Sequence, residues 1–151
     1  LGATNTNRAF SIEYGNIVHR LLQYLPDYPL QKRRDYARNY LNIKASHWYE
    51  SQREDALRHV WKILDHVYLK PLFSEHSRAE VSLMGIVKIR GKEHAISGQI
   101  DRLYITQNSI IFADFKTGTP PENEAAIASH HWLQMALYRK LLQAIHPDKD
   151  I

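Results

Sequence analysis

Two aspartates and a lysine in the second half of the chain have a spacing that could do chemistry. Asp101 closes the stretch Gly98-Gln99-Ile100-Asp101, and Lys116 lies two residues beyond Asp114. Two neighbouring carboxylates repel each other unless a positive charge compensates them. A hard divalent cation, Mg²⁺ or Mn²⁺, prefers carboxylate oxygen and keeps several waters for chemistry. An acid pair with an adjacent lysine is therefore a catalytic arrangement.

A β-hairpin would bring these two aspartates together. A turn centred between Gln107 and Asn108 sets Asp101 directly opposite Asp114. Opposed residues hold their Cβ atoms about 4.5–5.5 Å apart, which makes the need for a cation acute. A slip of one residue would also destroy two apolar matches. The matched pairs are Ile105 with Ile110, and Leu103 with Phe112.

A simpler interpretation treats the acids as ends of salt bridges, Asp101 with Arg102 and Asp114 with Lys116. The segment before Lys116 is apolar on both faces of the expected strand, from Ile110 to Phe115. Charged side chains that emerge from a buried strand are costly and usually have a function. The pattern favours the catalytic interpretation.

The elements that must position these residues follow from hydrophobic periodicity. Apolar residues at helical spacing come first, alternating and apolar segments follow, and a last helix carries Trp132, Met135 and Leu141. We expect an α/β (α+β) fold with an N-terminal helical half and a three-strand meander. The expected helices are 11–25, 31–44, 51–67 and 129–145, and the expected strands are 79–89, 94–105 and 109–116.

Bulk composition limits the classes of protein. With 151 residues and 44% hydrophobic content, the chain can form a single domain over residues 1–151. The formal charge of +4 suits a polyanionic partner. Zero cysteines exclude disulfides, thiolate zinc sites and iron–sulfur clusters. We find no membrane-length apolar run and no signal peptide, so we expect a cytoplasmic protein.

Four short motifs resemble those of the RecB-type branch of PD-(D/E)XK nucleases. They occur in the family's order and cover most of the chain, which makes the joint match specific. Two further stretches, His19-Arg20-Leu21-Leu22 and Ala79-Glu80-Val81, resemble the AddA type more than RecB itself. The four motifs are Gly15-Asn16-Ile17-Val18-His19, Gly98-Gln99-Ile100-Asp101-Arg102-Leu103, Ala113-Asp114-Phe115-Lys116-Thr117-Gly118 and Gln134-x-x-x-Tyr138.

The resemblance implies a restriction-endonuclease-like core with a mixed central sheet, and it implies roles for single residues. Its metal ligands would be His19, Asp101, Asp114 and the backbone carbonyl of Phe115. A lone histidine on an apolar helix face would otherwise be interpreted as a core or surface residue. Lys116 would orient the attacking water or stabilise charge in the transition state.

Three more residues have weaker assignments. Glu80 could support a second ion or a water, or could be an ordinary charge on an edge strand. Gln134 and Tyr138 share one face of the last helix. The resemblance implies that they position DNA or support the ligands, whereas Tyr138 alone would suit ordinary helix packing.

The resemblance also implies cofactors and partners. The ion would be Mg²⁺, with Mn²⁺ as the alternative and no iron–sulfur cluster. Gly91-Lys92 lacks the rest of a phosphate loop, so no ATP site is expected here. The domain would be part of an ATP-dependent helicase-nuclease for recombinational repair of double-strand breaks. Its partners would be the rest of the AddA helicase chain, an AddB-type subunit, and single DNA strands unwound at breaks, without any membrane.

Several alternatives stay open. The chain could be a degenerate nuclease fold that only binds DNA or another subunit, or a stand-alone phage or defence nuclease. Leu1 in place of methionine and the end at Ile151 suggest a domain cut from a longer chain. We expect one more strand after the last helix, which Ile151 would leave incomplete. The basic run Lys32, Arg33, Arg34 and Arg38 is more typical of a solvated helix face than of a DNA contact.

Overall fold

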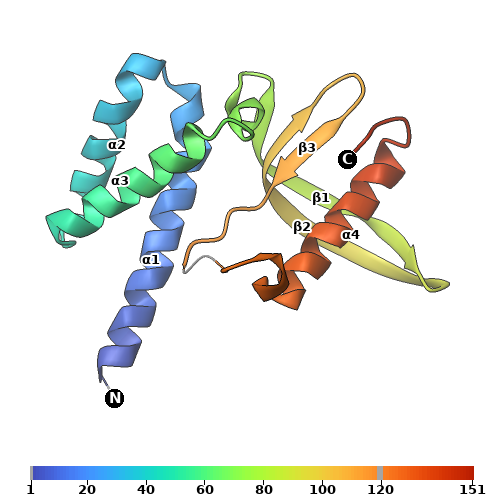
Figure 1. Cartoon of the computed structure of the whole chain (residues 1–151), viewed down its shortest axis with the longest axis horizontal. Coiled ribbons are helices and arrows are strands. Elements are labelled where there is room, and N and C mark those ends of the chain that lie inside the picture. Colours follow the sequence, from blue (N-terminus) through green and yellow to red (C-terminus); the bar gives the residue numbers. More distant parts are fainter. Residues whose placement is uncertain (1, 119–120) are drawn as a thin grey trace. The chain divides into compact units, whose positions relative to one another are not determined.

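The structure is a computed structural model that describes residues 2–118 and 121–151. Within these stretches three α-helices come first, a three-stranded antiparallel sheet follows, and a fourth α-helix comes last in sequence (Figure 1). The predicted α+β class and the predicted order of elements are confirmed. No helix in the described stretches is both long enough and apolar enough to cross a bilayer.

The chain divides into two compact units. The helical unit comprises Leu1–Glu75 and Phe115–Gly118, and the sheet unit comprises His76–Asp114 and Thr119–Ile151. The boundary therefore cuts the motif Asp114-Phe115-Lys116 after its first residue. That residues 1–151 work as one nuclease domain stays a prediction.

The helical unit contains α1 (Gly2–Tyr24), α2 (Leu30–Lys44) and α3 (Glu50–Leu64). The apolar stripe expected on the first helix forms the core of the helical unit. The 3₁₀ turn η1 (Leu25–Asp27) follows α1 and contains Pro26, where the helix was expected to stop. A second 3₁₀ turn, η2 (Lys70–Phe73), follows α3. The stripe residues are at most 6% exposed: Ile17, Val18, Leu21, Leu22 and Leu25.

Two predicted helix boundaries are wrong. α1 begins at Gly2 and not at Ser11, because the preceding residues lack an apolar stripe but also lack a proline that would stop a helix. α3 ends at Leu64 and not at Val67. The Val67 side chain is 68% exposed, so its helical spacing is not matched by burial.

The sheet consists of β1 (Ser77–Ile89), β2 (Lys92–Ile105) and β3 (Ile110–Ala113), in the order β1-β2-β3. The predicted meander is confirmed. β1 begins two residues before the expected Ala79. β2 begins two residues earlier than expected because only Arg90 and Gly91 form the turn between the strands, with φ of 49° and 80°. Positive φ at both central residues is what a tight type I′ hairpin turn requires.

The predicted register between β2 and β3 is confirmed, with Leu103 opposite Phe112 and Ile105 opposite Ile110. The hydroxyl of Thr106 fastens the turn between these strands. Its oxygen accepts the backbone N–H of Ser109 at 2.8 Å and that of Asn108 at 3.3 Å. The backbone N–H of Thr106 donates to the Ser109 carbonyl at 2.8 Å, which closes the turn.

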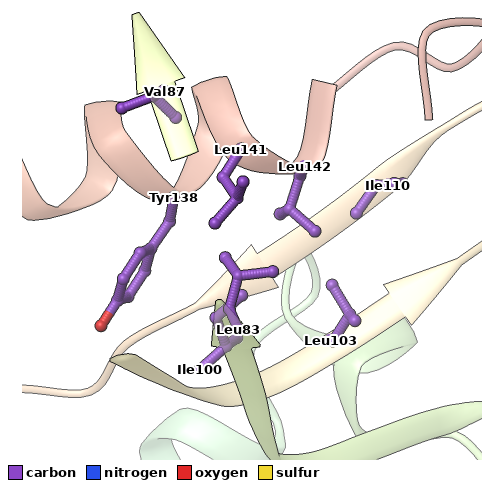
Figure 2. Close-up of a cluster of buried hydrophobic side chains, with 8 residues drawn as sticks. All are labelled: Leu83, Val87, Ile100, Leu103, Ile110, Tyr138, Leu141 and Leu142. Atoms are coloured by element: carbon purple, nitrogen blue, oxygen red, sulfur yellow. The ribbon is translucent and has the colours of Figure 1, made fainter. Parts of the chain in front are cut away.

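The fourth helix, α4 (Ser129–Ile145), covers the core of the sheet unit. Figure 2 shows Leu141 and Leu142 of α4 pointing toward Leu83 and Leu103 of the sheet. Gly85 on β1 permits this close packing, because a Cβ there would lie 2.6 Å from a Leu141 methyl carbon. The buried cluster consists of Leu83, Val87, Ile100, Leu103, Ile110, Tyr138, Leu141 and Leu142.

The predicted end of the third strand is wrong. β3 stops at Ala113, so Asp114 and Lys116 lie outside the strand and its two-residue alternation does not place them on one face. The cause is Phe115, whose ring stacks on Phe73 with centroids 5.9 Å apart. The sequence suggested an apolar strand residue, but the ring packs in the helical unit.

Residues after α4 begin a pairing along the open edge of the sheet. Ser109 and Asp150 form an isolated parallel bridge, and the backbone N–H of Ile110 donates to the Asp150 carbonyl at 2.7 Å. The Nζ of Lys149 donates to the Gln107 carbonyl at 2.6 Å. This bridge is the start of the parallel pairing that a further strand, and hence the predicted mixed sheet, would require.

Candidate active site

Three acidic residues of the sheet unit, here called the acid row, lie at or next to paired strand positions. In the β1–β2 ladder Ala79 pairs with Arg102 and Val81 with Ile100, so Glu80 and Asp101 stand across from each other between these pairs. In the β2–β3 ladder the last pair is Arg102 with Ala113. Asp114 follows Ala113 directly, one residue beyond the end of β3. The three acids, all partly buried, are Glu80, Asp101 and Asp114.

The sheet is irregular where the acids lie. Glu80 has a φ of 53°, a left-handed conformation that costs a residue with a side chain about 1–2 kcal/mol. Its pairing with Asp101 is missing from an otherwise continuous ladder. Ile100 and Leu103 also belong to one buried cluster, although regular alternation would put residues three apart on opposite faces. The acids thus mark a break in the pleat.

Arg102, next to Asp101, is the residue that sequence reasoning missed. It is 2% exposed, the only charged residue among the described ones to be so buried, and its Nη1 donates to the Ser77 hydroxyl at 3.0 Å. Its register partners, Ala79 and Ala113, have short side chains that leave room for a guanidinium. A buried cation one residue from Asp101 adds positive charge beside the acid row.

A glycine and a tyrosine from two different motifs meet in the sheet unit. A Cβ on Gly98 would lie 2.0 Å from the Tyr138 hydroxyl oxygen, so only glycine fits there. Gln134 donates from Nε2 to the same hydroxyl at 3.3 Å. Tyr138 is 5% exposed and belongs to the core, which agrees with helix packing. Its position against β2, three residues before Asp101, makes it a support for that strand.

A second glycine explains a contact in the helical unit. A Cβ on Gly15 of α1 would lie 2.6 Å from the Thr117 side-chain oxygen. One helical turn later, the His19 ring meets the Phe115 ring edge-on with centroids 6.4 Å apart. Gly15 and His19 therefore present one face of α1 to the segment that carries Lys116.

The predicted residues are thus gathered in two sets, one in each unit. The sheet unit holds the acid row with Gln134 and Tyr138, and the helical unit holds His19 with Phe115, while Lys116 is exposed. In the described parts of the chain, no three His, Asp or Glu side chains form a group that could hold a metal ion.

Acids at a break in an antiparallel meander, with a lysine two residues beyond the last acid, suit a metal-dependent nuclease. The family comparison agrees, since the model of the PD-(D/E)XK nuclease superfamily matches residues 1–150. The match spans nearly the whole chain, and the protein belongs to the PD-(D/E)XK nuclease superfamily. No curated protein matches the chain.

Proposed function

We propose that the chain is a DNA nuclease that hydrolyses phosphodiester bonds with a divalent cation. The observation that carries the proposal is the register of β2 and β3, whose last pair, Arg102 with Ala113, consists of the chain neighbours of Asp101 and Asp114. Membership of a nuclease superfamily supports it independently. The irregular backbone at Glu80 supports it further, because strained backbone concentrates at functional sites.

The donor set fits a hard cation. Mg²⁺ is usually bound through one or two carboxylates and keeps several waters, so Asp101 and Asp114 suffice as its charged ligands. We assign His19 and the backbone carbonyl of Phe115 as further ligands because their motifs resemble those of the RecB type, and Glu80 as support for a water or a second ion. Mn²⁺ should substitute for Mg²⁺ because it shares the preference for oxygen. A bound cation supplies Lewis-acid activation of water and of the scissile phosphate.

The remaining roles belong to the chain's own side chains. Lys116 is exposed, and its ammonium group would stabilise negative charge on the phosphate or orient the attacking water. Tyr138 and Gln134 keep α4 against β2 at Gly98 and so hold the strand that carries Asp101. These two are positioning residues.

The finer assignment is to an AddA-type helicase-nuclease, and it rests on the motifs around His19 and Glu80. In that role the domain receives single strands unwound at double-strand breaks during recombinational repair in the bacterial cytoplasm. The rest of the helicase chain and an AddB-type subunit would be its partners. Adding these partners should make cleavage depend on ATP, which a stand-alone nuclease would not show.

Cleavage of labelled single-stranded DNA tests the reaction. The chain should cut in the presence of Mg²⁺, and EDTA should stop it. Asp114→Ala should lower the rate at least about a hundredfold, as loss of a group that acts on the transition state does. Glu93→Ala is the matched control, since Glu93 is an exposed acid on β2 far along the strand from Asp101. Equal cutting by Asp114→Ala and the parent would refute the assignment.

Calorimetric titration with Mn²⁺ separates a nuclease from a degenerate fold. The parent and Glu93→Ala should bind the ion, and Asp101→Ala should not. A degenerate fold would bind DNA without binding the ion or cutting. Absence of ion binding by the parent would therefore contradict the proposal directly.

A further inference from the structure

A basic groove in the helical unit lies between α2 and α3. It encloses about 240 Å³ and is lined by side chains of both helices. A hollow of this size is smaller than the roughly 300 Å³ of the smallest typical ligand pockets, so it suits a phosphate with part of a sugar. Its lining residues are Arg34, Arg38, Glu54, Leu57, Arg58 and Trp61.

The charges of this groove are not balanced. Three arginines face one glutamate. Arg58 is already paired with Asp55, with Nη1 2.9 Å from the carboxylate oxygen. Among the described residues neither Arg34 nor Arg38 has a carboxylate partner, and both are exposed. Two guanidinium groups one helical turn apart are thus available to an external anion.

The groove also has an aromatic wall. The Arg34 guanidinium carbon lies 4.8 Å from the centre of the Trp61 ring. This cation–π contact holds the guanidinium in place before any ligand arrives, and it leaves the Arg34 N–H donors free to bind a phosphate. A basic groove beside an aromatic side chain is the usual architecture for tracking a single nucleic-acid strand.

The groove continues in both directions along the helices. Arg34 and Trp61 also line a hollow of about 670 Å³ that reaches Arg33 and Lys70. Arg38 also lines a hollow of about 380 Å³ that reaches Arg53. Arg33 donates to the Pro26 carbonyl and Arg53 to the Trp48 carbonyl. These two arginines therefore contribute positive charge, but some of their N–H donors are already used. Acids also line the outer hollows, Asp65 and Glu75 in one and Glu50 and Glu54 in the other, so the unbalanced positive charge is concentrated at Arg34 and Arg38.

We propose that the groove between α2 and α3 binds the phosphate backbone of a single nucleic-acid strand, with Arg34 and Arg38 as its phosphate ligands. The inference goes beyond the proposed function and does not require that the chain cut DNA. It also changes the interpretation of the basic run on α2, which the sequence alone favoured as a solvated face. Binding through phosphates predicts little sequence preference and a strong dependence on salt.

Fluorescence anisotropy with a labelled oligo(dT) strand, in EDTA to prevent cleavage, tests the proposal. The double variant Arg34→Ala/Arg38→Ala should bind more weakly. Its slope of log K against log salt should be shallower by about 1.4, which is the value for two lost single-strand phosphate contacts. The variant Arg34→Lys/Arg38→Lys keeps both charges and should keep the slope of the parent. Circular dichroism would check that each exposed-residue variant folds.

The matched control removes the same charge from the same helix. Lys32 and Lys44 are exposed residues of α2 outside the lining of the groove, and Lys32→Ala/Lys44→Ala should change the slope much less. An equal loss in both double variants would overturn the proposal, as would an unchanged slope in the arginine variant. If the arginine double variant bound duplex DNA more weakly than the parent but bound oligo(dT) equally well, a single strand would not be the occupant of the groove. The salt slope is measured in EDTA, and cleavage in Mg²⁺ is measured separately, so failure to cleave and failure of the groove are distinguishable.

Discussion

Glu80 adopts a left-handed backbone conformation inside a strand of 13 residues, and no tight turn requires it there. The conformation has a cost of about 1–2 kcal/mol for any residue with a Cβ. Glycine would avoid that cost, although glycine in a strand loses about 0.5–1 kcal/mol through its unfolded-state entropy. The two effects oppose each other, so stability alone does not explain why a glutamate stands at this position. A role for the Glu80 carboxylate would explain it.

We predict that Glu80→Gly leaves the free energy of unfolding unchanged or raises it by up to about 1 kcal/mol. The control Ser82→Gly, at an exposed site on the same strand with ordinary backbone geometry, should lose about 0.5–1 kcal/mol. Urea midpoints measure both. If Glu80→Gly loses as much as Ser82→Gly, the backbone at Glu80 is not strained. Weaker Mn²⁺ binding by Glu80→Gly would support its proposed role.

Glu13 on α1 accepts hydrogen bonds from two residues that follow α2. The Trp48 Nε1 lies 3.1 Å and the His47 Nε2 3.0 Å from the same carboxylate oxygen. The hydrogen bond from Trp48, and then that from His47, lowers the pKa of Glu13 below its ordinary value of 4.5. A lowered carboxylate pKa means stability that is present above pH 4.5 and is lost as the pH falls through the folded-state value.

We predict that Glu13→Gln lowers the free energy of unfolding at pH 7 and has a smaller effect at pH 3.5. The loss should stay below about 1 kcal/mol, because the Glu13 side chain is 39% exposed and water screens it. Urea unfolding at the two pH values measures it. The exposed Glu122→Gln serves as the control, and an effect of Glu13→Gln that grows toward acid pH would contradict the assignment.

At the scale of elements, α1 and the segment after β3 meet through Gly15 and Thr117. A glycine inside a helix costs about 0.5–1 kcal/mol relative to alanine. Here it makes room for the Thr117 side-chain oxygen, while the Thr117 Cβ would stay 3.8 Å from an added methyl group. The fit therefore depends on one oxygen atom.

We predict that Thr117 decides whether Gly15→Ala raises or lowers the free energy of unfolding. In the parent the added methyl group collides with the Thr117 oxygen, so the helix gain is cancelled or reversed. In a Thr117→Ala background the same substitution should stabilise the chain by about 0.5–1 kcal/mol. A double-mutant cycle from thermal unfolding gives the coupling. Equal effects of Gly15→Ala in the two backgrounds would rule out the contact.

The elements also show how far sequence reasoning reaches. The register of β2 and β3 could be predicted because matched apolar pairs such as Leu103 and Phe112 fit only one alignment. The end of β3 could not, because Phe115 has the residue type of a strand and only its contact with the distant Phe73 removes it. Gly98 was a missed signal, since glycine in a strand often marks a close approach.

The residues of the proposed site were predictable as motifs, but their local surroundings were not. Nothing in the order of residues encodes the left-handed φ of Glu80 or the burial of Arg102. The same holds for the basic run on α2. Its charges could be counted from the sequence, but whether an acid neutralises Arg34 and Arg38 depends on which side chains α3 presents.

At the scale of the whole molecule, ion binding and stability are linked. In the proposed site Asp101 and Asp114 bind the cation together, and a ligand that binds only the folded chain stabilises it. At a cation concentration of about 100 times its dissociation constant, this gain is about 2.7 kcal/mol. The proposed ligands should thus make the stability of the chain depend on the cation.

We predict that Asp114→Asn loses the stabilisation that the cation gives the parent. In saturating Mn²⁺ the parent should melt about 5–10 °C higher than in EDTA, and the variant should gain much less. Differential scanning calorimetry measures both states, with Glu93→Gln as the control that gains as much as the parent. An equal gain in Asp114→Asn would argue against Asp114 as a ligand.

The turn after β2 has a consequence beyond its own stability. The Thr106 hydroxyl accepts hydrogen bonds from two backbone N–H groups and so fixes the number of residues in the loop. The loop length in turn sets the register of the residues that follow, up to Asp114. Thr106→Val keeps the shape and β preference of the residue but removes both hydrogen bonds. β3 could then pair with β2 one residue out of register, which would move Asp114 relative to Asp101. Nuclease chemistry would then be silenced from a turn that carries no catalytic group.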